Sequence, residues 1–506
     1  MKGKVYLVGA GPGDPGLITL RAVELLAEAD VVVYDFLANP ALLAHASATA
    51  EMIYVGKKGG DHTLAQDRIN QLIVDLALAG KSVVRLKGGD PFIFGRGGEE
   101  AEELYDAGVP FEVVPGVSSV TAAPAYAGIP LTHRNFTASV GFVTGHEDPT
   151  KPESSLQWDK LATALGTLVF VMGVKNLPRI SANLIANGRD PATPAALVRW
   201  GATPEQETLV GTLADIAELA ARRGLKPPAV LVVGGVVGLR KKLNWFETLP
   251  LFGRTILVTR TRSQAGRLTK GLRALGARAI ECPTIRLEPP EDWAPLDRAL
   301  AELASFDWLV LTSPNGVDYL FQRLWENGLD VRALAPLKLA VIGPATAEKL
   351  EEKKLRPDLI PKRFVAEGLV EAFREIGVGG RRILLARALE ARDVLPRELT
   401  AAGAEVVTVP LYRTLPPLDL TREAREALAG GLVDLVTLTS SSTATNLVDL
   451  LGDQAADFKH KVKAASIGPI TSQTARELGL NVAVEAREYT IDGLINALVE
   501  YFGGRR

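Results

Sequence analysis

The chain has 506 residues, and a typical domain size of roughly 150 residues predicts about three or four compact units. Hydrophobic residues at 47% and charged residues at 23% are ordinary globular values, which exclude a disordered or fibrous chain. The net charge of -2 leaves no general basic field, which disfavours a nucleic-acid partner. No apolar run approaches the roughly 18 residues that span a bilayer, so we expect no membrane segment and a cytoplasmic location.

Cysteine and histidine are scarce in this sequence. The single cysteine, Cys282, excludes an intrachain disulfide and a cysteine metal cluster. The five histidines are scattered and do not show the paired spacing on a helix that binds zinc. We therefore expect no dedicated metal site.

Short β-branched runs alternate with helical stretches rich in Ala, Leu and Glu along the whole chain. The runs lie at residues 5–8, 31–34, 83–86, 168–172, 230–233, 256–259, 309–312, 383–386 and 435–439. This alternation predicts an α/β protein with mostly parallel sheets. A new strand after Gly253 predicts a domain junction near residues 246–252, short and ordered because it carries no Gly/Ser tract.

Beyond this junction the sequence repeats itself at a fixed offset. An offset of 127 residues carries 256–258 onto 383–385 and 312–313 onto 439–440. After a two-residue slip, an offset of 125 carries 342–344 onto 467–469. The repeat predicts two related α/β units with a ligand cleft between them.

Three glycine-rich or small-residue stretches mark the first half, at residues 9–15, 86–100 and 115–134. A nicotinamide fingerprint needs glycine at the sixth position of the first stretch, where this chain has Asp14, so a dehydrogenase remains only an alternative that NAD binding would test. In the second stretch Gly88 and Gly89 would let a ligand approach the backbone beside Asp90. The small residues of the third stretch suit a flat ligand or a packed helix equally.

Residues 3–245 resemble the tetrapyrrole methyltransferase family through these stretches, and most closely its uroporphyrinogen-III C-methyltransferases. The resemblance implies two α/β subdomains with S-adenosylmethionine between them, S-adenosylhomocysteine as product, no metal, and a homodimer formed through this half. The donor contacts that it implies are Pro12, Gly88, Gly89, Asp90, Ile93, Thr121, Ala122, Met172 and Gly201.

Two polar groups near strand ends match the family's acid and base positions. Asp35 is implied as general base and Lys57 as proton donor, although a helix cap and a solvated loop charge are the ordinary alternatives. The polycarboxylate substrate also requires cations. The candidates near the glycine-rich stretches, each of which could equally be a surface charge, are Lys58, Lys87, Arg96, His133 and Arg134.

Hydroxyl residues precede the predicted helices at the repeated strand ends of the second half. Each is an ordinary helix cap by default, but four helix starts around one cleft would also offer backbone N–H groups to a polyanion. Residues 253–506 resemble the uroporphyrinogen-III synthases through 311–317, 409–414 and 467–471. That family implies cyclisation of hydroxymethylbilane without a cofactor, Tyr412 as a weak acid, and carboxylate contacts from Ser313, Ser440 and Thr471.

We therefore predict a methyltransferase domain at residues 1–246 and a synthase domain at 253–506, with one lobe at about 253–286 plus 417–506 and the other at about 290–413. The enzyme would convert hydroxymethylbilane to uroporphyrinogen III and methylate it twice to precorrin-2, for sirohaem and cobalamin synthesis. Alternatively, the first half acts on another corrin intermediate, or the second is a non-catalytic two-lobed binding module. No dinucleotide domain precedes residue 1, so we expect no later oxidation or metal insertion.

Overall fold

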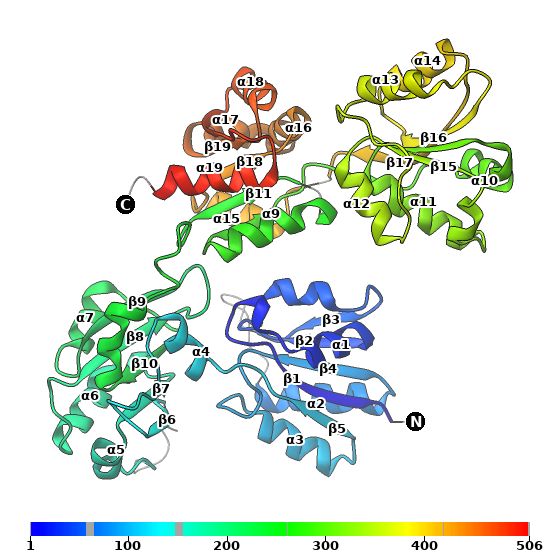
Figure 1. Cartoon of the computed structure of the whole chain (residues 1–506). Helices are drawn as coiled ribbons and strands as arrows, with labels where there is room; N and C mark the ends of the chain where they lie inside the picture. Colours follow the sequence, from blue (N-terminus) through cyan, green and yellow to red (C-terminus); the bar gives the residue numbers. More distant parts are fainter. Residues whose placement is uncertain (1, 57–64, 147–154, 261, 418, 504–506) are drawn as a thin grey trace. The chain divides into compact units, whose positions relative to one another are not determined.

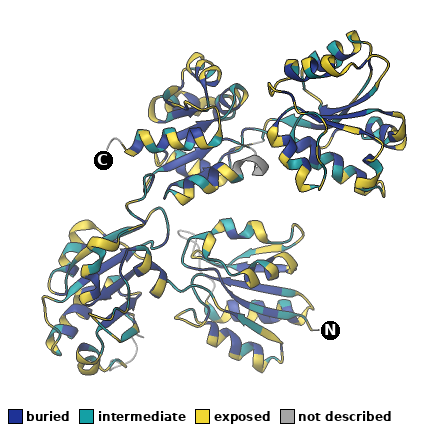
Figure 2. Ribbon diagram, viewed as in Figure 1, coloured by how far each residue is buried: buried dark blue, intermediate teal, exposed yellow. Residues whose placement is uncertain are grey.

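The computed structural model describes residues 2–56, 65–146, 155–260, 262–417 and 419–503. The chain divides into two compact units, Met1–Arg254 with Ala274–Arg278, and Thr255–Arg273 with Ala279–Arg506. Within the described ranges each unit holds two five-stranded sheets (Figure 1). The strands form the buried interior and the outer helix faces are exposed (Figure 2). Of the helices described, none is both long enough and apolar enough to cross a membrane.

The first sheet has the strand order β3-β2-β4-β1-β5, and all its strands are parallel. Helices α2 and α3 cover one face and α1 covers the other, so the strands are apolar on both sides. The elements are β1 (Lys4–Gly9), α1 (Leu20–Glu28), β2 (Val31–Tyr34), β3 (Glu51–Tyr54), α2 (Gln66–Leu78), β4 (Ser82–Lys87), α3 (Gly97–Asp106) and β5 (Phe111–Val114).

The second sheet has the order β6-β7-β10-β8-β9 and departs from the predicted parallel arrangement. Only β6 and β7 are parallel, and the other neighbours are antiparallel. A short loop joins β8 directly to β9, which antiparallel neighbours permit because no crossover helix is needed. The elements are α4 (Ser119–Tyr126), β6 (Val140–Thr144), α5 (Trp158–Ala164), β7 (Thr167–Val171), α6 (Leu177–Ala186), β8 (Pro194–Arg199), β9 (Glu207–Thr212), α7 (Ile216–Arg223), β10 (Ala229–Val233) and α8 (Arg240–Leu243).

The second unit contains the sheets β12-β11-β18-β19-β20, called lobe 1, and β13-β17-β16-β14-β15, called lobe 2. The helices of this unit are α9 (Arg262–Ala274), α10 (Ala294–Ala301), α11 (Pro314–Glu326), α12 (Pro344–Glu352), α13 (Ala366–Ile376), α14 (Val394–Ala401), α15 (Arg422–Ala429), α16 (Ser441–Leu451), α17 (Ala455–Lys461), α18 (Pro469–Glu477) and α19 (Ile491–Gly503).

Its strands are β11 (Thr255–Val258), β12 (Arg278–Glu281), β13 (Arg286–Glu288), β14 (Trp308–Leu311), β15 (Lys338–Val341), β16 (Arg382–Ala388), β17 (Glu405–Leu415), β18 (Leu435–Leu438), β19 (Lys463–Ser466) and β20 (Asn481–Glu485).

The internal repeat is visible in the strand order of the two lobes. The 127-residue offset relates β11 to β16 and β14 to β18, and the 125-residue offset relates β15 to β19. Strand β11 pairs with β18 in lobe 1, and β16 pairs with β14 in lobe 2. Each sheet therefore combines strands from both copies of the repeat.

Candidate functional site

Three glycines let the loops after β1, β4 and β5 approach one another at the carboxyl edge of the first sheet. A Cβ on Gly9 would lie 2.5 Å from the Cα of Gly116, and one on Gly116 would lie 2.3 Å from the carbonyl oxygen of Gly89. Gly11 and Gly89 also exchange backbone hydrogen bonds of 3.2 and 2.7 Å. Ligands of open α/β sheets bind at this edge, so these loops form the candidate site of the first unit.

Asp90 braces two of these loops. Its Oδ1 accepts hydrogen bonds from the backbone N–H groups of Phe92 at 2.8 Å and Ile93 at 3.1 Å. Its Oδ2 accepts from the N–H of Gly116 at 3.0 Å. The carboxylate is therefore held by three backbone donors that join the β4 loop to the β5 loop.

The three glycines predicted to contact the donor have different surroundings. A Cβ on Gly88 would lie 2.4 Å from the Cβ of Leu37, and one on Gly201 would lie 2.3 Å from the Cβ of Ala123. At both positions the missing side chain allows another part of the chain to pack. At Gly89, whose φ is +70°, the nearest atoms would be 3.8 Å from a Cβ. Gly89 is thus the one of these three at which a Cβ would make only ordinary van der Waals contacts, with Ser118 and Ser119.

The turn that carries Pro12 is fixed from two sides. The Tyr126 hydroxyl at the end of α4 donates a 2.8 Å hydrogen bond to Oδ2 of Asp14. Burial, and then this hydrogen bond, raise the pKa of Tyr126. The carbonyl oxygen of Gly13 accepts a 2.6 Å hydrogen bond from the Asn39 side chain. These contacts give the turn a defined shape next to the β4 loop.

The other predicted donor contacts lie on α4 and on two loops. Thr121 is exposed in the first turn of α4, where its hydroxyl donates to the carbonyl oxygen of Ser118, whereas Ala122 is buried. Ile93 is 41% exposed after β4, and Met172 is 53% exposed after β7 with a φ of 56°. Both large apolar side chains are thus accessible to a ligand.

Asp35, the predicted general base, follows β2 and has a hydrogen-bond partner on each oxygen. Oδ1 accepts from the N–H of Leu37 at 3.1 Å, and Oδ2 forms a 3.1 Å ion pair with the Arg85 guanidinium. The Asp35 side chain is 26% exposed, and Leu37 packs against Gly88. Asp35 therefore lies beside the β4 loop of the candidate site.

Lys87 is not available to a ligand, contrary to the sequence-based interpretation. Its side chain is 4% exposed and its ammonium lies 2.7 Å from Oε1 of the fully buried Glu100. Burial is the main cause that lowers the pKa of Lys87, followed by the neighbouring Arg85. Lys87 and Arg85 alternate along β4, so both side chains point to the same face of the sheet. That alternation of charges in an apolar strand was the sequence signal for this buried cluster.

The other predicted substrate cations are near the surface, or outside the described ranges. Arg96 precedes α3 and forms a 2.6 Å ion pair with Glu99, which holds the pKa of Glu99 below its usual range. His133 accepts a 3.2 Å hydrogen bond from the N–H of Asn135, and Arg134 is exposed. Lys57 and Lys58 lie outside the described residues.

Exposed apolar side chains gather on the loops after β2 and β4. Phe36 and Leu37 follow β2, while Phe92 and Phe94 follow β4, and each is between 42% and 59% exposed. The Phe36 ring lies 5.8 Å from that of Trp200 in the loop before Gly201. Such a rim suits a flat aromatic or pyrrolic ligand.

In lobe 2, two predicted residues of the second half meet. The Tyr412 hydroxyl on β17 lies 2.9 Å from the Ser313 hydroxyl, which also caps α11 by accepting from the N–H of Gly316 at 3.0 Å. Tyr412 is 6% exposed and its ring stacks on Tyr319 with a centroid distance of 5.5 Å. Burial raises the pKa of Tyr412. Tyr412 is therefore a buried side chain whose hydroxyl bonds to Ser313 and Asn315.

The equivalent helix starts of lobe 1 carry Ser440 and Thr471. Ser440 caps α16 by accepting from the N–H of Thr443 at 3.2 Å, and its hydroxyl lies 2.9 Å from that of Ser442. Thr471 is 5% exposed in the first turn of α18. The N-cap residue of α18, Gly468, provides no side-chain cap.

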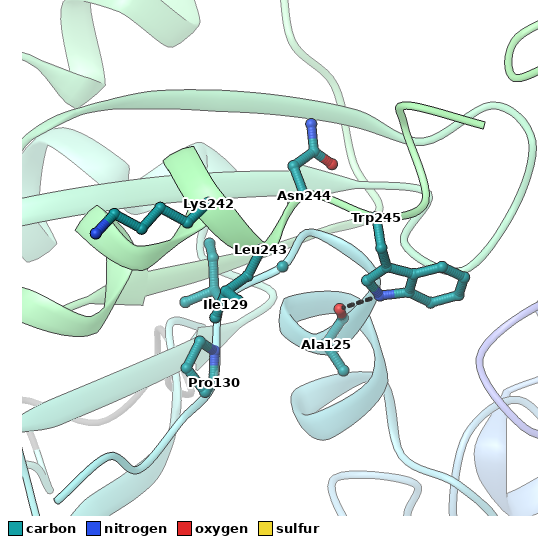
Figure 3. Close-up of a pocket in the computed structure, with 8 residues that line it drawn as sticks. Ala125, Ile129, Pro130, Lys242, Leu243, Asn244 and Trp245 are labelled. Atoms are coloured by element: carbon teal, nitrogen blue, oxygen red, sulfur yellow. Dashed lines mark hydrogen bonds between the residues drawn. The ribbon is translucent and has the colours of Figure 1, made fainter. Parts of the chain in front are cut away.

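A separate cavity of about 530 Å³ lies between residues 125–130, at and after the end of α4, and residues 242–245, at and after the end of α8 (Figure 3). Ile129, Leu243 and Trp245 give it an apolar lining, and the Trp245 indole donates a 3.1 Å hydrogen bond to the carbonyl oxygen of Ala125. None of the predicted donor contacts lines this cavity. In the part of the chain that is described, no group of three or more His, Cys, Asp or Glu could hold a metal ion.

Comparison with known proteins identifies both halves. The family model of the tetrapyrrole (corrin/porphyrin) methylases matches residues 4–217, and that of uroporphyrinogen-III synthase HemD matches residues 266–496. The chain is 39% identical over 502 residues to the porphyrin biosynthesis protein HemD of Ruminiclostridium josui, covering 99% of both chains.

Two further proteins match the first half. The S-adenosyl-L-methionine-dependent uroporphyrinogen III methyltransferase of Methanosarcina barkeri is 56% identical over 242 residues, which are 48% of this chain and 95% of that protein. The solved structure of uroporphyrin-III C-methyl transferase from Thermus thermophilus with S-adenosyl homocysteine is 42% identical. It covers 47% of this chain and 100% of its own, with a TM-score of 0.41.

Proposed function

The chain belongs to the tetrapyrrole methylase family through its first half and to the uroporphyrinogen-III synthase family through its second, and we propose that it catalyses two consecutive steps of tetrapyrrole synthesis. The second half converts hydroxymethylbilane to uroporphyrinogen III. The first half methylates that product twice with S-adenosylmethionine and yields precorrin-2. Methyl transfer is assigned to residues 1–246 and cyclisation to 253–506, with lobes at about 253–286 plus 417–506 and about 290–413.

One observation carries the proposal for the first half. Gly89 lies in the loop at the carboxyl edge of a parallel sheet, where a Cβ would meet no close contact, and Asp35 lies beside the same β4 loop. A flat substrate can therefore rest on the apolar rim next to a carboxylate and to a loop held by Asp90. This combination supports methyl transfer to a pyrrole carbon better than it supports a nucleotide-dependent reaction, because the turn has Asp14 where a dinucleotide site needs glycine.

The residues present fit a bound donor. The exposed Ile93 and Met172 side chains offer an apolar surface, and the loop at Gly89 and the turn at Pro12 offer backbone groups. Thr121, Ala122 and Gly201 complete the donor contacts that we propose, together with Gly88 and Asp90. S-adenosylmethionine, when bound, supplies an electrophilic methyl group.

The chain itself then has to orient the macrocycle and move protons. Asp35 accepts a proton from the methylated ring system, and Lys57 returns a proton to it. Arg96, His133, Arg134 and Lys58 bind the peripheral carboxylates of the substrate. In this division of roles the apolar rim fixes the ring plane and the cations fix its rotation.

In the second half the substrate loses its terminal hydroxyl as water, the last pyrrole ring inverts, and the macrocycle closes. Tyr412 donates the proton that lets the hydroxyl leave, and Ser313 holds the Tyr412 hydroxyl in position. Ser440 and Thr471 bind substrate carboxylates at the helix starts of lobe 1. The buried Tyr412 side chain, whose hydroxyl bonds to Ser313 and Asn315, supports this assignment.

A homodimer formed through the methyltransferase half and a cytoplasmic location complete the proposal. Sedimentation analysis of the full chain tests the first, and cell fractionation tests the second.

One incubation tests the two activities together. The full chain is given hydroxymethylbilane with and without S-adenosylmethionine, and the tetrapyrroles are identified by chromatography and mass spectrometry. We expect uroporphyrinogen III without the donor and precorrin-2 with it. Accumulation of uroporphyrinogen I, which forms when the bilane closes without ring inversion, would contradict the synthase assignment. Unmethylated uroporphyrinogen III in the presence of donor would contradict the methyltransferase assignment.

A further inference from the structure

A buried ion network stands behind Asp35, and no step of the proposed mechanism uses it. Arg85 bridges two carboxylates, with one guanidinium nitrogen 3.1 Å from Oδ2 of Asp35 and its Nε 3.2 Å from Oε1 of Glu100. Lys87 binds the same Glu100 oxygen at 2.7 Å. The side chains of Arg85 and Lys87 are each 4% exposed, and that of Glu100 is 0% exposed.

Glu100 is oriented by α2 as well as by β4. Its Oε1 also accepts a 3.1 Å hydrogen bond from the Gln66 amide. Gln66 in turn donates to Asn70, which donates to Glu103 on the next turn of α3. Oε2 of Glu100 is buried without a hydrogen-bond partner among the described residues. All directed contacts of the carboxylate therefore converge on the oxygen that holds Arg85.

Such a network is a poor way to gain stability. Removing charges from water costs several kcal/mol per ion, and well-packed apolar side chains often replace a buried ion pair without loss of stability. Its two cations, Arg85 and Lys87, lie on β4 among Val83, Val84 and Leu86. Of the two carboxylates that Arg85 bridges, Glu100 is fully buried and Asp35 is 26% exposed. The buried charges are therefore connected, through Arg85, to Asp35, whose carboxylate is accessible to a ligand.

We propose that Arg85 is the positioning residue of Asp35 and that Glu100 fixes Arg85 for this task. The Arg85 guanidinium holds Oδ2 while the N–H of Leu37 holds Oδ1, which fixes the plane of the Asp35 carboxylate beside the β4 loop. The Asp35 carboxylate is then already oriented when it accepts the proton of the substrate. This inference rests on the proposed role of Asp35 as proton acceptor.

The test measures methyl transfer and donor binding separately in the full chain. For Arg85→Gln we expect the turnover number for methylation of uroporphyrinogen III to fall about 10- to 100-fold, as for other supporting residues of reactive groups. The Kd of S-adenosylhomocysteine, from calorimetry, should change less than about 3-fold, because no predicted donor contact touches Arg85. Arg85→Lys should recover part of the turnover, since it keeps the charge but cannot hold both carboxylates at once.

Two more variants make the result specific. Glu100→Gln keeps an acceptor for Arg85 but removes the charge, so a smaller loss of turnover with unchanged donor binding is expected. Arg21→Gln is the matched control, because Arg21 is half exposed and binds Glu112 and Glu24 on the surface of the same subdomain. It should leave turnover and donor binding unchanged.

The variants distinguish the role of Asp35 as proton acceptor from the role of Arg85 as its positioning residue. Full turnover in Asp35→Asn would contradict the proposed function of Asp35 itself. Loss of turnover in Asp35→Asn together with full turnover in Arg85→Gln would overturn only the present inference. If both Arg85→Gln and Arg85→Lys lose S-adenosylhomocysteine binding, Arg85 serves the fold alone and the inference is also overturned.

Discussion

The two lobes of the second unit share one scaffold but differ in the polar groups at their helix starts. Ser313 of lobe 2 and Ser440 of lobe 1 are related by the 127-residue offset, and each caps the helix that follows it. In lobe 2 the serine hydroxyl also meets Tyr412. At the position equivalent to Tyr412, lobe 1 has Ile285. The lobe 1 serine instead meets Ser442.

This difference shows how a duplicated fold can divide its work. A buried tyrosine with a serine partner can deliver a proton to one defined place, whereas a serine that only caps a helix and faces a second hydroxyl can bind an anion but not replace a weak acid. The scaffold strands are alike in both lobes, so the proposed chemistry depends on a few side chains near the ends of β14 and β17. This difference is the reason why we propose proton donation for lobe 2 and carboxylate binding for lobe 1.

We expect the largest loss of stability from substitutions in the equivalent strands β14 and β18. Leu311 and Leu438 are equivalent, end β14 and β18, and are both 0% exposed in the cores of their lobes. Replacing either by alanine should lower the free energy of unfolding by about 3 kcal/mol through lost contacts and a cavity. Hydrogen exchange followed by mass spectrometry should show loss of protection in the sheet that carries the substitution. Equal loss in both sheets from either variant would contradict two separately packed cores.

Tyr412→Phe tests the division of chemistry directly. It removes the hydroxyl and keeps the ring that stacks on Tyr319, so cyclisation should slow by about 100-fold if proton donation is lost. The rate of uroporphyrinogen III formation measures this, and methyl transfer by the same chain should be unchanged. Tyr319→Phe is the matched control and should cyclise at the parent rate. An unaltered rate in Tyr412→Phe would remove Tyr412 from the mechanism.

The Tyr412 and Ser313 pair illustrates what could be predicted from the sequence. Repeated strand ends and helix caps are local patterns, so the α/β class, the repeat and the candidate hydroxyls could all be predicted from the residues and the family resemblance. The contact between these two residues depends on β17, β16 and β14 lying side by side across 99 residues of chain. No local pattern encodes that order.

The first unit also contains contacts that no local sequence pattern could predict. Asp35 could be predicted as a polar residue at a strand end, but its partner Arg85 could not, because β2 lies beside β4 only through a crossover. Gly88 suggested an open surface in the sequence, yet Leu37 from another loop fills that space. The antiparallel order of the second sheet also depends on tertiary pairing rather than on the alternation of strands and helices.

Ser313 and Ser440 cap equivalent helices but are expected to serve different steps of cyclisation. Ser313→Ala and Ser440→Ala each remove a helix cap and should each lower the free energy of unfolding by about 1 kcal/mol. Their kinetics should differ. Ser313→Ala should lower the turnover number of cyclisation because Tyr412 loses one of its two hydrogen-bond partners, Ser313 and Asn315, whereas Ser440→Ala should mainly raise KM for hydroxymethylbilane. Denaturant unfolding and steady-state kinetics on both variants measure this, and identical kinetic changes would show that the lobes do not divide the work.

We expect the smallest change in stability when a buried residue of lobe 1 is replaced by its equivalent from lobe 2. Cys282 in lobe 1 is equivalent to Val409 in lobe 2, and both are buried. Cys282→Val should therefore leave the free energy of unfolding within about 1 kcal/mol of the parent at pH 7.

At alkaline pH the free energy of unfolding should differ between the parent protein and Cys282→Val. Burial raises the pKa of the Cys282 thiol from 9.0 to about 12. Below pH 9 the thiol is protonated whether the chain is folded or unfolded, so it adds no pH dependence. Between pH 9 and 12 the unfolded chain loses this proton while the folded chain keeps it, and the stability of the parent falls by up to about 1.4 kcal/mol per pH unit. Cys282→Val lacks this loss, so guanidinium unfolding at pH 8 and pH 10.5 should show a steeper decline for the parent. Equal declines would mean that the thiol ionises in the folded lobe, and that the core of lobe 1 is more open than that of lobe 2.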